Sequence, residues 1–167
     1  MVWEKSLIKY YNYISIERNL SKNSVESYMR DITQFSKFNT KTPPLKIKRK
    51  NILEYINYIN DHSISARSQA RILSSIRSFF NFLIFENKIT SDPCEHIYSP
   101  KIGSKIPITL STQEIDKIIE SIDLSQENGE RNRTIIECLY SCGLRVSELI
   151  TLKISNLLFD EKIVQVI

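Results

Sequence analysis

The sequence predicts a mainly α-helical protein, and three observations support this fold class. The chain has 167 residues but contains 3 glycines and 5 prolines, which is few helix breakers for this length. Apolar residues recur at helical spacing throughout residues 1–88. Residues 89–110, with three prolines and no helical period, then separate this region from residues 111–167, which end in a pattern typical of a β-hairpin. We therefore expect two domains joined by a linker.

Residues 1–88 contain four amphipathic helical patterns. The first runs from about Val2 to Arg18, and the second follows Ser21, a residue that caps helix N-termini well. The prolines in TKTPPLK (40–46) end the second helix, and the remaining two span about Arg49–Asp61 and Ser65–Asn87. Four such helices form a compact bundle. We interpret the Tyr and Phe residues of the first two helices as core rather than as platforms for nucleic-acid bases.

Residues 111–167 predict two helices, a sharp turn, a short helix and a hairpin. STQE (111–114) is a capping box in which Ser111 caps the helix and Glu114 bonds back; this helix reaches about Ile122. A helix over about 130–142 stops at Gly143, which suits the left-handed position after a helix. A short helix from Arg145 to Leu152 precedes two strands joined by a turn at 160–162. Because a lone hairpin is marginally stable in water, this mixed α/β domain is expected to be incomplete.

Charge is distributed unevenly along the chain. Residues 1–88 hold 15 Lys and Arg against 7 Asp and Glu, a balance of +8, whereas residues 89–167 hold 8 against 12, a balance of −4. A basic small domain favours a polyanionic partner, most often nucleic acid, although a solvated lysine-rich face is the alternative. No apolar run approaches the length of a membrane span and no signal-peptide core is present, so we expect a cytoplasmic protein without a membrane partner.

The three cysteines do not indicate a disulfide framework or a metal centre. An odd number of cysteines in a cytoplasmic chain argues against disulfides. Cys138 and Cys142 are spaced as two metal ligands could be, but no histidine or third cysteine lies near them in sequence. We therefore expect both to be small buried residues and expect no metal and no other cofactor.

The fourth predicted helix carries a basic stripe opposite its apolar stripe. In a helical projection of residues 65–83, the basic stripe holds Arg67, Arg71, Ser74 and Ser78, with Arg77 and Ser75 on its flanks. It contains no acidic residue, unlike ordinary solvated faces that alternate Lys and Glu. Arginine forks and serine hydroxyls both bind phosphate. The stripe predicts a duplex-DNA contact surface.

The segment LYSCGLRVSELITL (139–152) places a charged residue, Arg145, among apolar and small ones. A buried charge there would cost several kcal/mol unless it were paired or had a function. Glu148 lies three residues later on the same helical face and can orient the guanidinium. Two interpretations follow from the residues alone: a structural ion pair at a helix junction, or an anion-gripping arginine at a helix N-terminus.

Four stretches of the sequence together carry a resemblance to a known family: LSKNSVESYMRDITQF (20–35), ARSQARILSSIRSFFNFL (66–83), SDPCEHIYSPKIGSKIPITLS (91–111) and LYSCGLRVSELITL (139–152). They resemble the tyrosine site-specific recombinases of the phage integrase family, the Xer type most of all, and the resemblance covers the whole chain. Residues 139–152 are the most specific of the four stretches, and the family often has Ala-Thr where this chain has Ser141–Cys142.

The resemblance implies a fold and a chemistry. Residues 1–88 would be a SAM-like core-binding bundle that clamps DNA, and residues 111–167 the start of the catalytic domain. Arg145 would grip the scissile phosphate, with Glu148 orienting it. The family breaks and rejoins DNA through a 3′-phosphotyrosine without metal or small-molecule substrate, in a recombinase tetramer on a four-way junction at a specific recombination site. Chromosome dimer resolution is a role of the Xer type.

The resemblance also implies that this chain is about half of a recombinase. The family's hairpin lysine, His-x-x-Arg helix and nucleophilic tyrosine follow further along the chain, and neither His62 nor His96 begins a His-x-x-Arg motif. We expect these 167 residues alone not to cleave DNA. Two alternatives stay open: a non-catalytic DNA-binding protein derived from a recombinase, and a helical module that binds protein only.

Overall fold

The computed structural model describes residues 2–103 and 108–166, and the chain divides into two compact units, Met1–Ser104 and Lys105–Ile167. The division falls inside the predicted linker, of which residues 104–107 lie outside the described residues. The domain limits at 88 and 110 remain predictions. The mainly α-helical class is confirmed, since seven α-helices and one two-stranded sheet are seen in the described residues.

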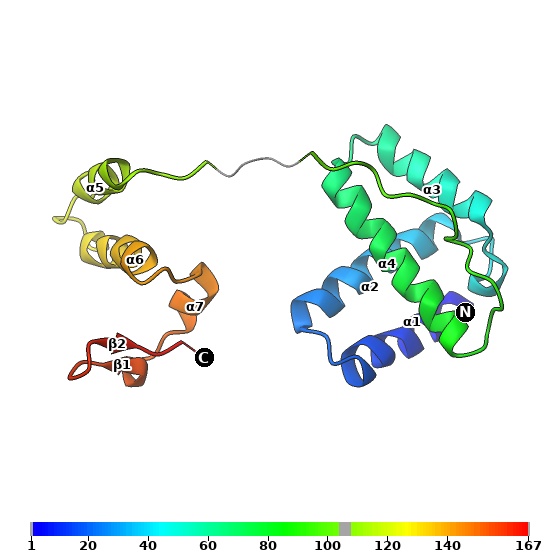
Figure 1. The fold of residues 1–167 in the computed structure, drawn as a ribbon, viewed down its shortest axis with the longest axis horizontal. Coiled ribbons are helices and arrows are strands. Elements are labelled where there is room, and N and C mark those ends of the chain that lie inside the picture. Colours follow the sequence, from blue (N-terminus) through cyan, green and yellow to red (C-terminus); the bar gives the residue numbers. More distant parts are fainter. Residues whose placement is uncertain (1, 104–107, 167) are drawn as a thin grey trace. The chain divides into compact units, whose positions relative to one another are not determined.

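Four helices build the first unit, as predicted (Figure 1). They are α1 (Val2–Asn12), α2 (Lys22–Phe38), α3 (Arg49–Asp61) and α4 (Ala66–Phe85), with a short 3-10 turn at Pro44–Lys46. Ser21 and Ser65 cap α2 and α4 by accepting the backbone N–H of Ser24 and Ser68. The expected first helix differs in its last turn, because Tyr13–Glu17 is π-helical.

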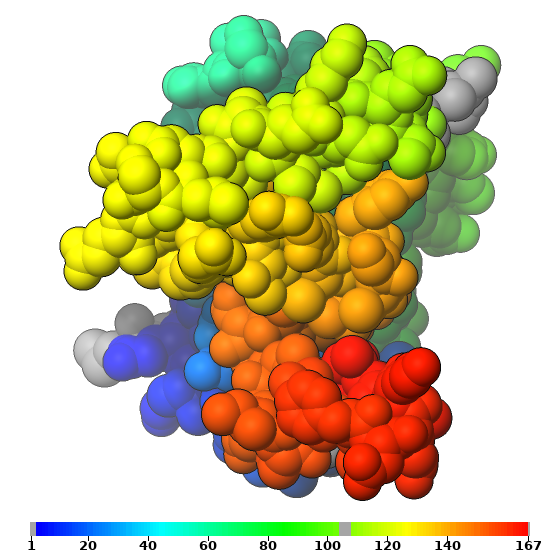
Figure 2. Space-filling view, turned by 90° about the vertical axis from the view of Figure 1, so that its left-hand side faces the viewer, coloured from blue at the N-terminus to red at the C-terminus, as the bar shows by residue number. Residues whose placement is uncertain are grey.

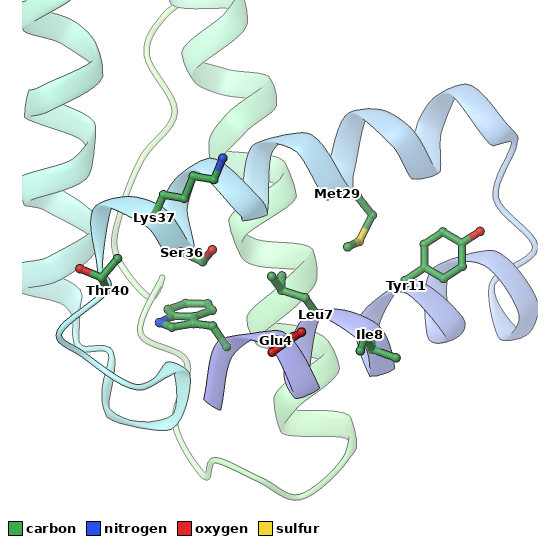
Figure 3. A pocket seen from close by; sticks show the side chains of 9 residues that line it. Glu4, Leu7, Ile8, Tyr11, Met29, Ser36, Lys37 and Thr40 are labelled. Carbon is green, nitrogen blue, oxygen red and sulfur yellow. The ribbon is translucent and has the colours of Figure 1, made fainter. Parts of the chain in front are cut away.

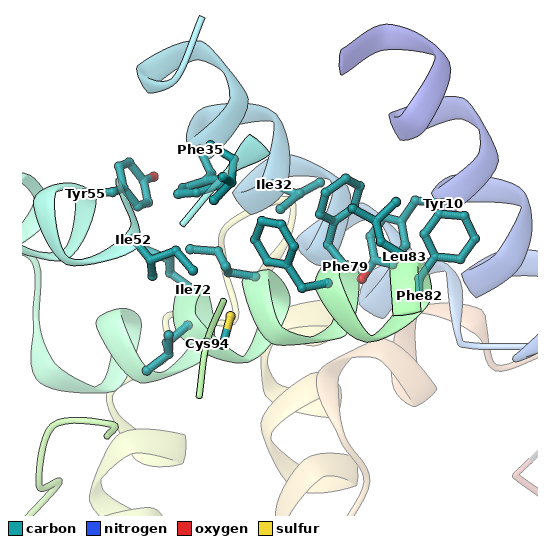
Figure 4. Close-up of a cluster of buried hydrophobic side chains, with 14 of the residues drawn as sticks. Tyr10, Ile32, Phe35, Ile52, Tyr55, Ile72, Phe79, Phe82, Leu83 and Cys94 are labelled. Carbon is teal, nitrogen blue, oxygen red and sulfur yellow. The ribbon is translucent and has the colours of Figure 1, made fainter. Parts of the chain in front are cut away.

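The core of the first unit follows α4. Figure 4 shows buried side chains of α1, α2 and α3 arranged along this helix. Tyr10, Phe35 and Phe79 are fully buried, and the ring centroids of Tyr10 and Phe79 lie 5.3 Å apart in an edge-on contact. Trp3 stacks on Phe79 and donates its indole N–H to the carbonyl of Thr42 at 2.9 Å. Tyr10 and Phe35 are therefore core, as expected of the aromatic residues of the first two helices, but the expectation is wrong for Tyr11 and Phe38, which are 49% and 40% exposed because they lie on the outer faces of their helices.

Residues 89–99 also belong to the first unit. Cys94 and Ile97 are 3% and 4% exposed and belong to the hydrophobic core. Burial raises the pKa of the Cys94 thiol, which makes it a poor nucleophile. The first part of the predicted linker thus packs on the bundle instead of crossing solvent.

The second unit contains α5 (Thr112–Glu120), α6 (Gly129–Ser141), α7 (Val146–Thr151), a 3-10 turn at Ile154–Asn156, and the strands β1 (Leu157–Leu158) and β2 (Ile163–Val164). The strands are antiparallel, with Leu157 opposite Val164. Figure 2 shows α5, α6 and the hairpin as successive parts of one face of this unit. The capping box predicted at Ser111 and Glu114 is present, with both hydrogen bonds formed.

None of the helices in the described ranges is both long and apolar enough to cross a membrane.

Candidate nucleic-acid interface

The predicted basic stripe lies on the least buried face of α4. Arg67, Arg71 and Ser74 are exposed, and Arg77 and Ser78 are half-buried. The buried face is wider than the periodicity indicated, because Leu73, Ser75 and Phe82 are also buried. Among the described residues no polar group pairs with the Arg67 guanidinium or the Ser74 hydroxyl, so both are available to an external anion.

Arg71 has protein partners. Its Nη1 donates to the Oγ of Ser27 at 2.9 Å and to a carboxylate oxygen of Asp31, both on α2. Asp31 is 1% exposed, and the same carboxylate oxygen accepts the Ser75 hydroxyl at 2.8 Å. A buried carboxylate requires such a counter-charge, so Arg71 neutralises a core anion whether or not it also binds DNA.

Arg77 also has protein partners within the first unit, and Ser78 lies against the core. Arg77 donates to the carbonyl oxygen of Ile97 and, at 3.4 Å, to the Ser99 hydroxyl, which holds residues 97–99 against α4. Ser78 lies beside Tyr10: burial raises the pKa of Tyr10 and the Ser78 hydroxyl opposes this. The Tyr10 hydroxyl nevertheless has no partner in hydrogen-bond geometry among the described residues. The predicted stripe is thus divided between free and engaged side chains.

Arg145 begins α7 on an extended backbone, directly after a left-handed turn. Gly143 has φ +62°, the positive angle expected of a glycine that ends a helix. Arg145 follows as the N-cap of α7 with φ −76° and ψ 152°. Its side chain is 82% exposed, so the guanidinium projects into solvent instead of entering a core.

Glu148 holds Arg145 with both carboxylate oxygens. Oε2 accepts the Arg145 backbone N–H at 2.6 Å, and Oε1 accepts Nη1 at 2.7 Å. These bonds lower the pKa of Glu148, the backbone bond most and the guanidinium bond next. The predicted contact between the two residues is therefore present. Because one of five guanidinium N–H donors is used, the others remain available to an oxyanion.

The cysteine expectation is wrong for Cys142, which is exposed, and Cys138 is partly buried. Both lie near the end of α6, where the second unit presents little buried surface: in its described residues the sole buried position is Gly129. No group of three or more His, Cys, Asp or Glu side chains in the described ranges is arranged to hold a metal ion.

A hollow of about 550 Å³ between α1 and α2 was not anticipated from the sequence (Figure 3). Figure 3 shows Leu7 and Met29 reaching into the space between the two helices. The lining contains one acidic residue, Glu4, and one basic residue, Lys37, beside apolar and hydroxyl side chains. It offers no paired acid and base and no cluster of cations, so it is not the anion-binding surface.

The sequence did not indicate the residues of α2 that meet α4. Ser27 and Asp31 lie four residues apart on α2, as Arg71 and Ser75 do on α4, and the two pairs face each other. Arg30 also donates to Ser27, at 3.5 Å. The i, i+4 spacing within each pair was visible in the sequence. The two pairs are about 40 residues apart along the chain, so no local sequence pattern predicts that they contact each other.

Comparisons with known proteins agree with this architecture. Residues 7–87 match the family model described as phage integrase, N-terminal SAM-like domain, and residues 109–167 match that of the phage integrase family. Tyrosine recombinase XerD of Oceanobacillus iheyensis is 40% identical over 158 residues, which are 92% of this chain and 53% of the relative. XerD of Staphylococcus aureus is 38% identical over 156 residues, with the same two shares. The chain spans about half the length of the curated relatives it matches.

Among solved structures, the integrase of the Tn1549 transposon in complex with circular intermediate DNA has a similar fold. Its TM-score is 0.67 at 19% identity, covering 96% of this chain and 53% of that chain. Integrase from mycobacterium phage Brujita has a TM-score of 0.54 at 18% identity, with the same coverage. At these identities the likeness concerns the fold. With both of its units matched by integrase models and XerD relatives aligned across most of its length, the chain belongs to the phage integrase family of tyrosine recombinases.

Proposed function

We propose that this chain is the DNA-clamping N-terminal part of a site-specific tyrosine recombinase, and that Arg145 grips the phosphate at which the complete enzyme cuts. The observation that carries the proposal is the Arg145–Glu148 arrangement. An 82% exposed guanidinium, fixed by a carboxylate at a helix start, lies in the segment that matches the phage integrase family. Arginine stays charged at any working pH and presents a planar fork that suits two phosphate oxygens.

In the complete protein, a tyrosine hydroxyl attacks the scissile phosphorus, forms a 3′-phosphotyrosine and releases a 5′-hydroxyl. Negative charge on the non-bridging oxygens then needs fixed donors, and Arg145 supplies them. Because Glu148 fixes the guanidinium beforehand, little reorganisation is needed as the charge develops. No metal ion or other cofactor and no small-molecule substrate takes part in this proposal.

The first unit would hold the duplex. Its predicted residues are Arg67, Arg71, Ser74, Arg77 and Ser78, and Arg67 is the one whose guanidinium has no protein partner among the described residues. The +8 balance of residues 1–88 supports a polyanionic partner. We further propose a specific recombination site, a tetramer on a four-way junction, a cytoplasmic location, and chromosome dimer resolution as the biological role.

DNA binding is tested by fluorescence anisotropy with a labelled mixed-sequence duplex, titrated over a range of NaCl concentrations. Arg67→Ala should weaken binding and flatten the plot of log K against log[NaCl] by ~0.9 for the lost phosphate contact. Lys50→Ala is the control, because it removes the same charge from an exposed site on α3. An unchanged slope for Arg67→Ala would remove this part of α4 from the interface, and absence of salt-dependent binding by the wild type would favour a protein-binding module.

A further inference from the structure

We propose that Asp31 is a positioning residue for DNA binding: it holds the Arg71 guanidinium so that the free edge of this group faces a DNA phosphate. The proposal rests on the proposed DNA-clamping function and assigns a role to a buried residue of α2. It joins residues that are 40 positions apart in sequence and meet at the α2–α4 contact.

The Asp31 carboxylate is placed to hold the Arg71 guanidinium. The carboxylate is 1% exposed, and one oxygen accepts both Arg71 and the Ser75 hydroxyl. Ser75 is itself fully buried. A carboxylate buried at this contact is too far from solvent to meet DNA, so any effect it has on DNA binding must act through Arg71.

Arg71 uses one edge for the protein and leaves the other exposed. Nη1 makes both of its bonds, to Asp31 and to Ser27, while the side chain remains 41% exposed. Within the described ranges, Nε and Nη2 have no partner. These two nitrogens form the edge of the guanidinium that binds two oxygens of one phosphate side by side.

The neighbours of Arg71 suit an anion. Arg67 and Ser74, one turn before and after it on α4, are exposed, and Arg30 on α2 shares the Ser27 hydroxyl with it. A guanidinium fixed among other cations loses less side-chain freedom on binding than a free one, which favours affinity. The arrangement repeats that of Arg145, where a carboxylate also holds Nη1 and leaves the rest of the group exposed.

Because Asp31 is negatively charged, removing its charge should change the affinity for DNA in a direction that depends on its role. Removing a negative charge from a DNA-binding unit should tighten binding if only Coulomb attraction matters. Removing the carboxylate that holds Arg71 in place should instead weaken DNA binding. Asp31→Asn keeps the size of the side chain and an acceptor for Ser75 but loses the charge, so the two expectations have opposite signs.

The experiment measures the affinity of the full chain for the labelled mixed-sequence duplex, with thermal unfolding followed by circular dichroism to confirm folding. The variants are Asp31→Asn, Arg71→Lys, Arg71→Ala and the double variant Asp31→Asn with Arg71→Ala. Arg71→Lys keeps a positive charge opposite Asp31 and so retains the buried ion pair. It therefore still tests the proposal if the Asp31→Asn variant fails to fold. We expect Asp31→Asn and Arg71→Lys each to weaken binding about tenfold, a size typical of residues coupled in one network.

The double variant should bind no more weakly than Arg71→Ala alone, because Asp31 acts through Arg71. Unchanged or tighter binding by Asp31→Asn, or wild-type affinity in Arg71→Lys, would overturn the proposal. Its failure is distinguishable from that of the proposed function: if Arg67→Ala weakens binding while the Arg71 variants do not, the DNA-binding face stands and the role of Asp31 falls. If the wild type does not bind the duplex, both fall.

Discussion

The contacts of Arg145 and Arg71 differ in how far the sequence could predict them. Glu148 lies three residues from Arg145, within one turn, so their contact was predicted from spacing and is confirmed. Asp31 is 40 residues from Arg71, and the sequence placed Arg71 on a stripe facing solvent without its partner. A helical projection reports which face a residue occupies, but not which side chain of another helix meets it.

At this scale we predict that the Glu148 carboxyl titrates below the ordinary glutamate value of about 4.3. Because the pKa is lowered in the folded chain, its contribution to capping α7 is complete above that ordinary value and is lost as pH falls through the depressed one. Carbon-13 NMR of the side-chain carboxyl measures the midpoint.

The hydrogen bond from the backbone N–H of Arg145 is the largest single cause of this lowered pKa, and the hydrogen bond from the guanidinium comes next. In Arg145→Ala the pKa of Glu148 should therefore stay lowered, since every residue but proline keeps that N–H. A midpoint that returned to the ordinary value in Arg145→Ala would show that the guanidinium, not the cap, holds the carboxylate.

The elements of the chain were predicted well where their signals are local. Ser21, Ser65 and Ser111 cap the helices they were expected to cap, because a hydroxyl needs only the next three residues to form its bond. The π-helical turn at Tyr13–Glu17 was missed, since its residues continue the same apolar periodicity. The width of the buried face of α4 was also missed, because it depends on how many neighbours surround that helix.

At the scale of the elements, we predict that Gly143→Ala destabilises the turn between α6 and α7. Gly143 has φ +62°, and an added Cβ would meet no atom within 4 Å, so Gly143→Ala should cost about 1 kcal/mol through backbone conformation alone. Hydrogen exchange should show the local free energy of opening at the α6–α7 junction reduced by this amount. Gly103→Ala is the matched control, since Gly103 has the same open space without a positive φ. Equal effects of both substitutions would show that the turn is not strained by a side chain.

The two units differ in how much apolar surface they bury. The first has a continuous aromatic core, whereas in the second Ile150 and Ile154 are 76% and 81% exposed, and no apolar side chain in its described residues is buried. The sequence predicted an incomplete second domain from its lone hairpin, and this stays a prediction. It did not predict that residues 89–99 join the first unit, because proline-containing segments lack a period by which packing could be recognised.

Limited trypsin digestion should therefore cut after Lys101 before it cuts after Lys88. Both side chains are exposed, but the chain after Lys88 is held to the bundle by Cys94 and Ile97, and a protease needs several residues in extended form. Ile97→Asp should release this segment and expose the Lys88 site. Early cutting after Lys88 in the wild type would show that residues 89–99 do not pack as described.

Arg145 as the phosphate-gripping residue is the central claim, and covalent DNA cleavage tests it most directly. A chimaera would join this chain to the part of Oceanobacillus iheyensis XerD that lies outside the region of similarity, which covers 53% of that relative. The substrate is a nicked suicide duplex carrying that relative's recombination site, and a denaturing gel detects the protein–DNA adduct.

The chimaera should form the adduct, and this chain alone should form none. Arg145→Lys in the chimaera keeps the charge but loses the fork and should slow adduct formation by ~10²–10³, the usual loss when one charge-stabilising donor is removed. Arg133→Lys, an exposed arginine paired with Glu137 on α6, is the control and should leave the rate unchanged. An adduct formed by this chain alone, or an Arg145→Lys chimaera as fast as its parent, would contradict the account.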